Sequence, residues 1–127
     1  MLARANRVVS AADYKTTVRR GRRTSTPHTL VYVAPRGDAP TRFGFIVSKT
    51  VGNSVTRNLV TRRFRAIGRE ALQLHPVGHD VVIRALPGSP EVSWSNLRGE
   101  VLNALGERAI ENKAAEPSVR GDEAGKR

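Results

Sequence analysis

The chain contains no cysteine, so disulfide scaffolds and thiolate metal sites are excluded. No apolar run approaches the length of about 20 residues that a transmembrane helix needs. The N-terminus also lacks an apolar core of about 7–15 residues, which a signal peptide would have. We therefore expect a cytoplasmic protein in a reducing compartment, without a membrane partner.

Acidic residues are scarce in the first part of the chain. Residues 1–70 hold 15 Arg and Lys against three acidic residues, whereas residues 71–127 hold 7 basic and 8 acidic residues. The net charge of the whole chain is +11, and 18 of the 22 basic residues are Arg. Codon usage in a GC-rich genome would also raise the Arg count, but guanidinium groups match phosphate geometry well. The first 70 residues are therefore expected to form a surface that binds a polyanion.

The length of 127 residues suits one domain. We assign residues 1–113 to this domain and expect a disordered tail over 114–127, where charged and small residues dominate. Hydrophobic periodicity and turn signals predict helices over 11–19, 54–73 and 93–112, and strands over 29–34, 42–48 and 80–86. The first two strands are expected to be antiparallel neighbours joined by the loop 35–40. The order α-β-β-α-β-α indicates an α+β or α/β sandwich with helices packed on a small sheet.

The helix expected over 54–73 has two contrasting faces when it is wound at about 100° per residue. One face carries polar and cationic side chains: Asn58, Arg62, Arg65 and Arg69. The opposite face carries apolar side chains: Val60, Phe64, Ile67 and Ala71. Because Glu70 is the only acidic residue nearby, the like charges of the arginines repel one another unless an anion binds them.

The segment from Val51-Gly52-Asn53 to Arg65 resembles the signature of the bacterial ribonuclease P protein family, V-G-N-A-V-x-R-N-x-x-K-R-x-x-R. The similarity extends over residues 2–110, through Asp13-Tyr14, the strand Arg42–Lys49 and the run Asp80–Ala85. The chain departs from the pattern at four positions: Tyr14 replaces Phe, Ser54 replaces Ala, Leu59 stands where a basic residue is common, and Thr61 replaces Lys.

The resemblance implies a fold, a reaction and partners. The implied fold is an α+β two-layer sandwich, similar to the second domain of ribosomal protein S5, with a left-handed β-α-β crossover that contains the arginine helix. The implied reaction is removal of the 5′ leader from precursor tRNA, in which the catalytic RNA performs the hydrolysis with bound Mg²⁺. The protein would bind the leader and dock on the catalytic RNA, with no obligate protein partner.

Three groups of candidate residues follow. Those expected to contact the catalytic RNA are Arg57, Asn58, Arg62, Arg63, Arg65 and Arg69. Those expected, by analogy with the family, to line a cleft for the leader are Tyr14, Val18, Tyr32, Phe45, Ser48 and Lys49. A supporting basic cluster comprises Arg7, Arg19, Arg20, Arg22 and Arg23, the last four at the end of the first helix and in the loop after it. Val18 and Phe45 are equally compatible with the core, and Asn58 with a cap.

Other residues receive structural interpretations. Trp94 is expected to anchor the core, and Gly44 within a strand indicates a close approach of another group. The three histidines, His28, His75 and His79, lack metal-ligand spacing and are interpreted as loop residues. No metal site is predicted in the protein.

The chain is expected to bind RNA without cutting it. Hydrolysis needs an acid–base pair or clustered carboxylates around metal ions, but Asp13, Asp38 and Glu70 are well separated in the basic half. The alternatives are a general or ribosomal RNA-binding protein without a ribozyme partner, and a metal-dependent nuclease that acts alone. DNA binding fits the charge, but no recognition-helix motif supports it.

Overall fold

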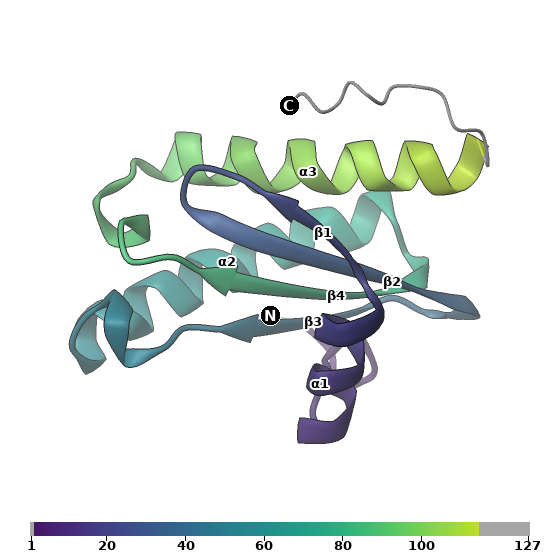
Figure 1. The fold of residues 1–127 in the computed structure, drawn as a ribbon, viewed down its shortest axis with the longest axis horizontal. Helices are drawn as coiled ribbons and strands as arrows, with labels where there is room; N and C mark the ends of the chain where they lie inside the picture. Colours follow the sequence, from purple (N-terminus) through teal and green to yellow (C-terminus); the bar gives the residue numbers. More distant parts are fainter. Residues whose placement is uncertain (1, 115–127) are drawn as a thin grey trace.

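The computed structural model describes residues 2–114 (Figure 1). The elements within this range are α1 Ala11–Arg20, β1 Arg22–Ser25, β2 Thr29–Pro40, β3 Arg42–Ile46, α2 Ser54–Leu74, β4 Val77–Ala85 and α3 Trp94–Ala114. Short 3-10 helices cover Arg4–Asn6, Lys49–Val51 and Ser89–Glu91. The predicted helices and strands are all present, and the α+β class is confirmed. Beyond residue 114, the predicted tail lies outside the described residues.

The four strands form one sheet in the order β1-β2-β4-β3. β2 is antiparallel to β1 and β4, whereas β3 is parallel to β4. The expectation that strands 29–34 and 42–48 are neighbours is wrong, because β4 lies between them. β4 takes this central position because it is apolar on both faces: Val81, Val82 and Ile83 are at most 3% exposed. β3, α2 and β4 thus form a β-α-β unit with parallel strands.

Strand β1 is an addition to the predicted elements. Arg22 and Arg23 were expected in the loop after the first helix, but they belong to this strand, whose four residues are all polar or charged. The strand forms because the backbone N–H of Thr26 donates to the carbonyl of Thr29 at 2.9 Å and closes a hairpin onto β2. β2 also continues beyond residue 34 to Pro40, with an irregular register between Pro35 and Pro40.

Helices pack on the sheet from opposite sides. In Figure 1, α2 and α3 lie on one side of the strands and α1 on the other. Val33 and Ile83 belong to the core under α2 and α3, while Tyr32 and Val82, their neighbours along the strands, are buried on the α1 face. The predicted apolar face of α2 is confirmed, since each of its residues is fully buried: Val60, Phe64, Ile67 and Ala71.

The interpretation of Trp94 as a core anchor is wrong. Trp94 is 37% exposed, although Leu97, Val101 and Leu105, which follow it at helical spacing in α3, are buried. Trp94 is the first residue of α3, and Val92 before it packs against the core at that end of the helix. At this end of α3, therefore, Val92 contacts the core and Trp94 lies outside the core cluster.

Candidate nucleic-acid interface

The segment Val51-Gly52-Asn53 sets the start of α2. Val51 is 6% exposed and inserts into the core, and Gly52 adopts a φ of 156°. A Cβ atom on Gly52 would lie 2.9 Å from the side chain of Thr56. Asn53 caps the helix, because its side-chain oxygen accepts the backbone N–H of Thr56 at 2.9 Å. Val51 therefore anchors the chain in the core, Gly52 makes the turn, and Asn53 caps the helix. Together they fix the position at which α2 begins and the direction in which its side chains point.

The exposed face of α2 carries uncompensated positive charge. Asn58, Arg62, Arg65 and Arg69 are all exposed. Among the side chains that the structure describes, residues 2–106, no partner forms an ion pair with the guanidinium group of Arg62, Arg65 or Arg69. We call Arg62, Arg65 and Arg69 the arginine row.

Glu70, the acidic residue beside the arginine row, is bound by another helix. Both of its carboxylate oxygens accept hydrogen bonds from Arg98 of α3, at 2.8 and 2.6 Å. These bonds lower the pKa of Glu70 and keep it ionised. Because Arg98 neutralises Glu70, this carboxylate does not reduce the positive electrostatic field of the arginine row.

The other two candidate arginines of α2 hold neighbouring loops. Arg57 donates from Nε to the carbonyl of Gly52 at 3.2 Å, and Arg63 donates from an Nη atom to the carbonyl of Val92 at 3.1 Å. Both residues are half-buried. They flank the arginine row, Arg57 toward the start of the helix and Arg63 toward α3. Their contact with RNA stays a prediction, as it does for the arginine row and Asn58.

The opposite face of the sheet carries the second candidate surface. Tyr14 and Val18 of α1 are both half-buried there. The ring of Tyr14 covers Gly44, and its hydroxyl oxygen accepts the backbone N–H of Phe45 at 3.2 Å. The predicted close approach at Gly44 is thus confirmed. Since β3 is an edge strand, Tyr14 also satisfies an N–H that no neighbouring strand pairs.

Two of the residues expected to line the leader cleft do not present their rings on the α1 face as predicted. Phe45 points to the other face of the sheet, where its ring lies 5.9 Å from that of Phe64, so it does not share a surface with Tyr14. Tyr32 is on the α1 face but only 6% exposed, which leaves little of its ring for a base. Ser48 and Lys49 are exposed where β3 leads into the 3-10 helix.

Sequence reasoning missed Arg84 on this face. Arg84 is exposed and lies between Leu30 of β2 and Ile46 of β3, its partners in the sheet register. A charged residue that interrupts the apolar run of β4, on the same side as Val82, is the signal that could have identified it. Arg84 brings a cation to the α1 face of the sheet.

The supporting basic cluster is spread over three elements. Arg7 pairs with Phe43 at the outer edge of β3. Arg19 and Arg20 end α1, and both are exposed. Arg22 and Arg23 lie in β1 and not in a loop; Arg23 is the register partner of Tyr32. Because side chains alternate along a strand, Arg23 shares the α1 face with Tyr32, whereas Arg22, the partner of Val33, lies on the opposite face of the sheet.

An ionic cluster attaches α1 to the sheet. Arg42 of β3 donates to both carboxylate oxygens of Asp80 in β4, at 2.9 and 2.8 Å, and to Asp13 of α1 at 3.2 Å. Arg36 adds a contact of 3.5 Å to Asp80. The two carboxylates raise the pKa of Arg42, chiefly through the hydrogen bonds with Asp80. Arg42 therefore connects three elements that frame the α1 face.

Replacing Gly44 with Ala should disturb the packing of the Tyr14 ring on β3. The new Cβ would lie 2.6 Å from the Tyr14 ring, so the ring must move and its hydrogen bond to Phe45 is strained. We expect the Gly44→Ala variant to lose about 1–3 kcal/mol in the free energy of unfolding, measured by urea denaturation. The same change in a Tyr14→Ala background should cost much less. An equal cost in both backgrounds would show that the ring is not the obstacle.

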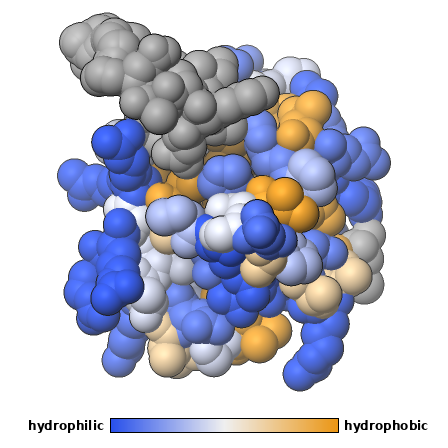
Figure 2. Space-filling model, turned by 90° about the vertical axis from the view of Figure 1, so that its right-hand side faces the viewer, coloured by the Kyte–Doolittle hydropathy of each residue, from blue (hydrophilic) through white to orange (hydrophobic). Residues whose placement is uncertain are grey.

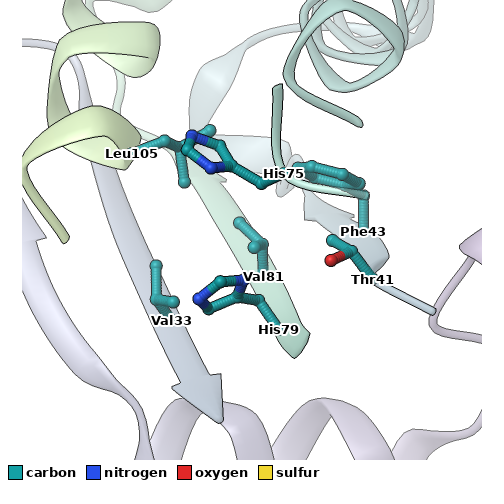
Figure 3. Close-up of a pocket in the computed structure, with 7 residues that line it drawn as sticks. All are labelled: Val33, Thr41, Phe43, His75, His79, Val81 and Leu105. Atoms are coloured by element: carbon teal, nitrogen blue, oxygen red, sulfur yellow. The ribbon is translucent and has the colours of Figure 1, made fainter. Parts of the chain in front are cut away.

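A small apolar pocket lies at the other end of α2 (Figure 3). His75 caps α2, whereas His79 lies in β4, so the loop interpretation is wrong for His79. The two rings meet edge to face, with centroids 6.2 Å apart. Nδ1 of His79 and Oγ1 of Thr41 are buried without a hydrogen-bond partner. The pocket is lined mainly by core side chains and is expected to serve packing.

This histidine pair should make stability depend on pH. Burial, and secondarily the neighbouring His79, lower the pKa of His75 below its ordinary value of 6.5. The unfolded chain therefore binds the proton more readily, so stability is complete above about pH 6.5 and falls as the pH drops toward the lowered pKa. Urea denaturation between pH 8 and 5 should show this loss, and His75→Gln should reduce it. An unchanged pH dependence in the variant would contradict the assignment.

Two apolar side chains are exposed at this end of the molecule. Figure 2 views it from the side where α2 ends and β4 begins, and hydrophobic residues form small separate patches among hydrophilic ones. Leu74 and Val77, 65% and 54% exposed, belong to this end. Among the described residues, no helix combines the length and hydrophobicity required to cross a bilayer.

Comparisons with known proteins agree with the motif. The family model "Ribonuclease P" matches residues 2–109. The ribonuclease P protein component of Clavibacter michiganensis is 54% identical over 106 residues, which cover 83% of this chain and 94% of that protein. The component of Pseudarthrobacter chlorophenolicus is 45% identical over 118 residues, covering 92% and 86%. The solved RNase P protein of Staphylococcus aureus has the same fold, with a TM-score of 0.72 at 22% identity over 83% of this chain and 96% of that one. This chain belongs to the ribonuclease P protein family.

Proposed function

We propose that this protein, as the protein subunit of ribonuclease P, uses its two surfaces for two RNA molecules. The arginine row of α2 docks on the catalytic RNA, and the α1 face of the sheet receives the 5′ leader of precursor tRNA. The observation that carries this proposal is the arginine row itself, three exposed and unpaired guanidinium groups opposite a fully buried apolar face. Such groups bind phosphates by paired hydrogen bonds.

The positive charge has a physical role in this assembly. The leader and the catalytic RNA repel each other, and a basic protein between them reduces that repulsion. Precursor tRNA should therefore bind more tightly than mature tRNA, which has no leader, and the bulk Mg²⁺ requirement should fall. These steps take place in the cytoplasm, where the cell makes and processes tRNA.

The protein by itself is proposed to be inactive. The two carboxylates near the α1 face, Asp13 and Asp80, are both bound to Arg42, so neither is a free general base. Among the described residues, no group of three or more His, Cys, Asp or Glu side chains could hold a metal ion. The Mg²⁺ ions that activate water for hydrolysis are therefore proposed to be bound by RNA phosphates. The protein's own residues bind and position RNA.

A cleavage assay tests the proposal. 5′-labelled precursor tRNA in low Mg²⁺ is incubated with the purified protein, with a bacterial ribonuclease P RNA, or with both. Cleavage at the mature 5′ end only when both are present is the expected result. Activity of the RNA that is unchanged by protein would favour a general RNA-binding protein, and cleavage by protein alone would overturn its non-catalytic role.

A further inference from the structure

The start of α3 carries a partly exposed aromatic side chain that lies outside the core cluster. Trp94 is 37% exposed and is the only tryptophan of the chain. Its neighbours Ser93, Ser95 and Asn96 are exposed polar residues. At this end of the helix, Val92 is partly buried and packs against the core. The indole is therefore an isolated apolar surface in a polar setting.

Three contacts place Trp94 beside α2. Arg63 of α2 binds the carbonyl of Val92, two residues before Trp94. Arg98, one helical turn after Trp94, leaves α3 on the same side and binds Glu70 of α2. Since Arg63 precedes Glu70 by two turns, both lie on the flank of α2 that faces α3. α3 thus begins along this flank, with Trp94 two residues after the carbonyl that Arg63 binds.

The surroundings of Trp94 select its partner. The neighbouring surface row of α2 is the arginine row. Glu70, the carboxylate of α2 on this flank, is neutralised by Arg98, and Glu91 lies exposed in the 3-10 helix before Trp94. A protein partner would require a larger apolar area than one indole amid serines and cations. Unpaired nucleotides, in contrast, bind where an aromatic ring stacks on a base and nearby arginines bind the backbone.

We infer that Trp94, together with Arg63, forms an additional RNA contact in which the indole stacks on an unpaired base of the catalytic RNA. The interface then extends from the arginine row across the α2–α3 boundary. This inference rests on the proposed docking of α2 on the catalytic RNA. It assigns Trp94 to that RNA and not to the leader, because Trp94 lies on the α2–α3 side of the sheet, opposite Tyr14.

Intrinsic fluorescence gives a direct test, because all tryptophan emission comes from Trp94. Titration with ribonuclease P RNA should change the emission and protect Trp94 from acrylamide quenching, saturating at the concentration that a filter-binding assay gives. A leader oligonucleotide should leave both signals unchanged. A response to the leader alone, or no response to bound ribonuclease P RNA, would overturn the inference.

Variants separate stacking from folding. Trp94→Ala should weaken filter binding of the catalytic RNA about 5- to 150-fold, whereas Trp94→Phe, which retains a ring, should stay within about threefold of wild type. Val77→Ser, which alters another exposed apolar residue at the far end of α2, should have no effect. Circular dichroism verifies the fold of each variant. If the folded Trp94→Ala variant binds fully while loss of the arginine row abolishes binding, only the Trp94 contact is refuted. If the wild-type protein does not bind the catalytic RNA, the proposed function is refuted as well.

Discussion

The Arg62→Ala, Arg65→Ala double variant is expected to bind the catalytic RNA about 100- to 1,000-fold more weakly than the wild-type protein. Each guanidinium group is exposed and unpaired in the free protein, so binding a phosphate breaks no internal contact. A charge-assisted hydrogen bond contributes about 1.5–3 kcal/mol. Because both sites are exposed to solvent, each is expected near the lower end of this range, about 1.5–2 kcal/mol, so that removing both costs about 3–4 kcal/mol. The loss should appear in filter binding at fixed salt.

Salt dependence identifies the cause of this loss. Each neutralised phosphate contributes about 0.7–0.9 to the slope of log affinity against log salt concentration, so the double variant should lower the slope by about 1.4–1.8. Loss of affinity with an unchanged slope would mean that the arginines act through the fold and not through phosphates.

A matched control removes the same charge elsewhere. Lys126→Ala with Arg127→Ala also lowers the net charge by two, but at the C-terminal end of the chain. This control should bind nearly as well as wild type. The stability of the Arg62, Arg65 variant should be unchanged or higher by a few tenths of a kcal/mol, because like-charge repulsion along α2 is relieved. Normal assembly by the folded double variant would refute the docking surface.

The sequence predicted α2 well because one physical signal dominates it. A period of 3.6 residues separates the cationic from the apolar side chains, and burial follows this division without exception at Val60, Phe64, Ile67 and Ala71. The start of the helix was equally readable, since a Gly-Asn pair provides both the unusual φ and the cap. The two faces of a helix follow from the spacing of apolar and charged residues, which can be read directly from the sequence.

The strand order was not predictable in the same way. Strands that follow one another in sequence are usually neighbours, which favoured a hairpin of residues 29–34 and 42–48. The fold instead places β4 between them, since a strand that is apolar on both faces gains most from the centre of the sheet. β1 gave no signal, because its residues are polar and its formation depends on the hairpin with β2.

The cleft residues illustrate a further limit. Side chains alternate along β3, so Gly44 faces α1 while Phe45 faces α2. Sequence gives the alternation but not which face α1 covers, because that depends on packing between distant segments. The same limit hid Arg84, whose place on the α1 face follows from its register with Leu30 and Ile46.

Arg42→Ala is expected to have the second largest effect, on stability and on leader binding. Arg42 and Asp80 have side chains only 18% and 15% exposed, and loss of Arg42 leaves Asp80 with the longer contact to Arg36. Breaking a fully buried ion pair costs about 3–5 kcal/mol, and the remaining Arg36 and partial exposure reduce the expected loss here to about 2–3 kcal/mol. Urea denaturation measures it.

Asp13→Asn separates positioning from stability within this cluster. Asp13 is 41% exposed and contacts Arg42 at 3.2 Å, so its loss should cost less than about 1 kcal/mol. The change nevertheless removes the ionic contact that holds α1 against the sheet, so precursor tRNA should lose part of its advantage over mature tRNA in binding to the holoenzyme. Affinity for the catalytic RNA alone should stay unchanged, because α2 lies on the other side of the sheet. If Asp13→Asn and Arg42→Ala both discriminate between the two tRNAs as well as the wild-type protein does, the α1 face does not bind the leader. The ionic cluster then has a purely structural role.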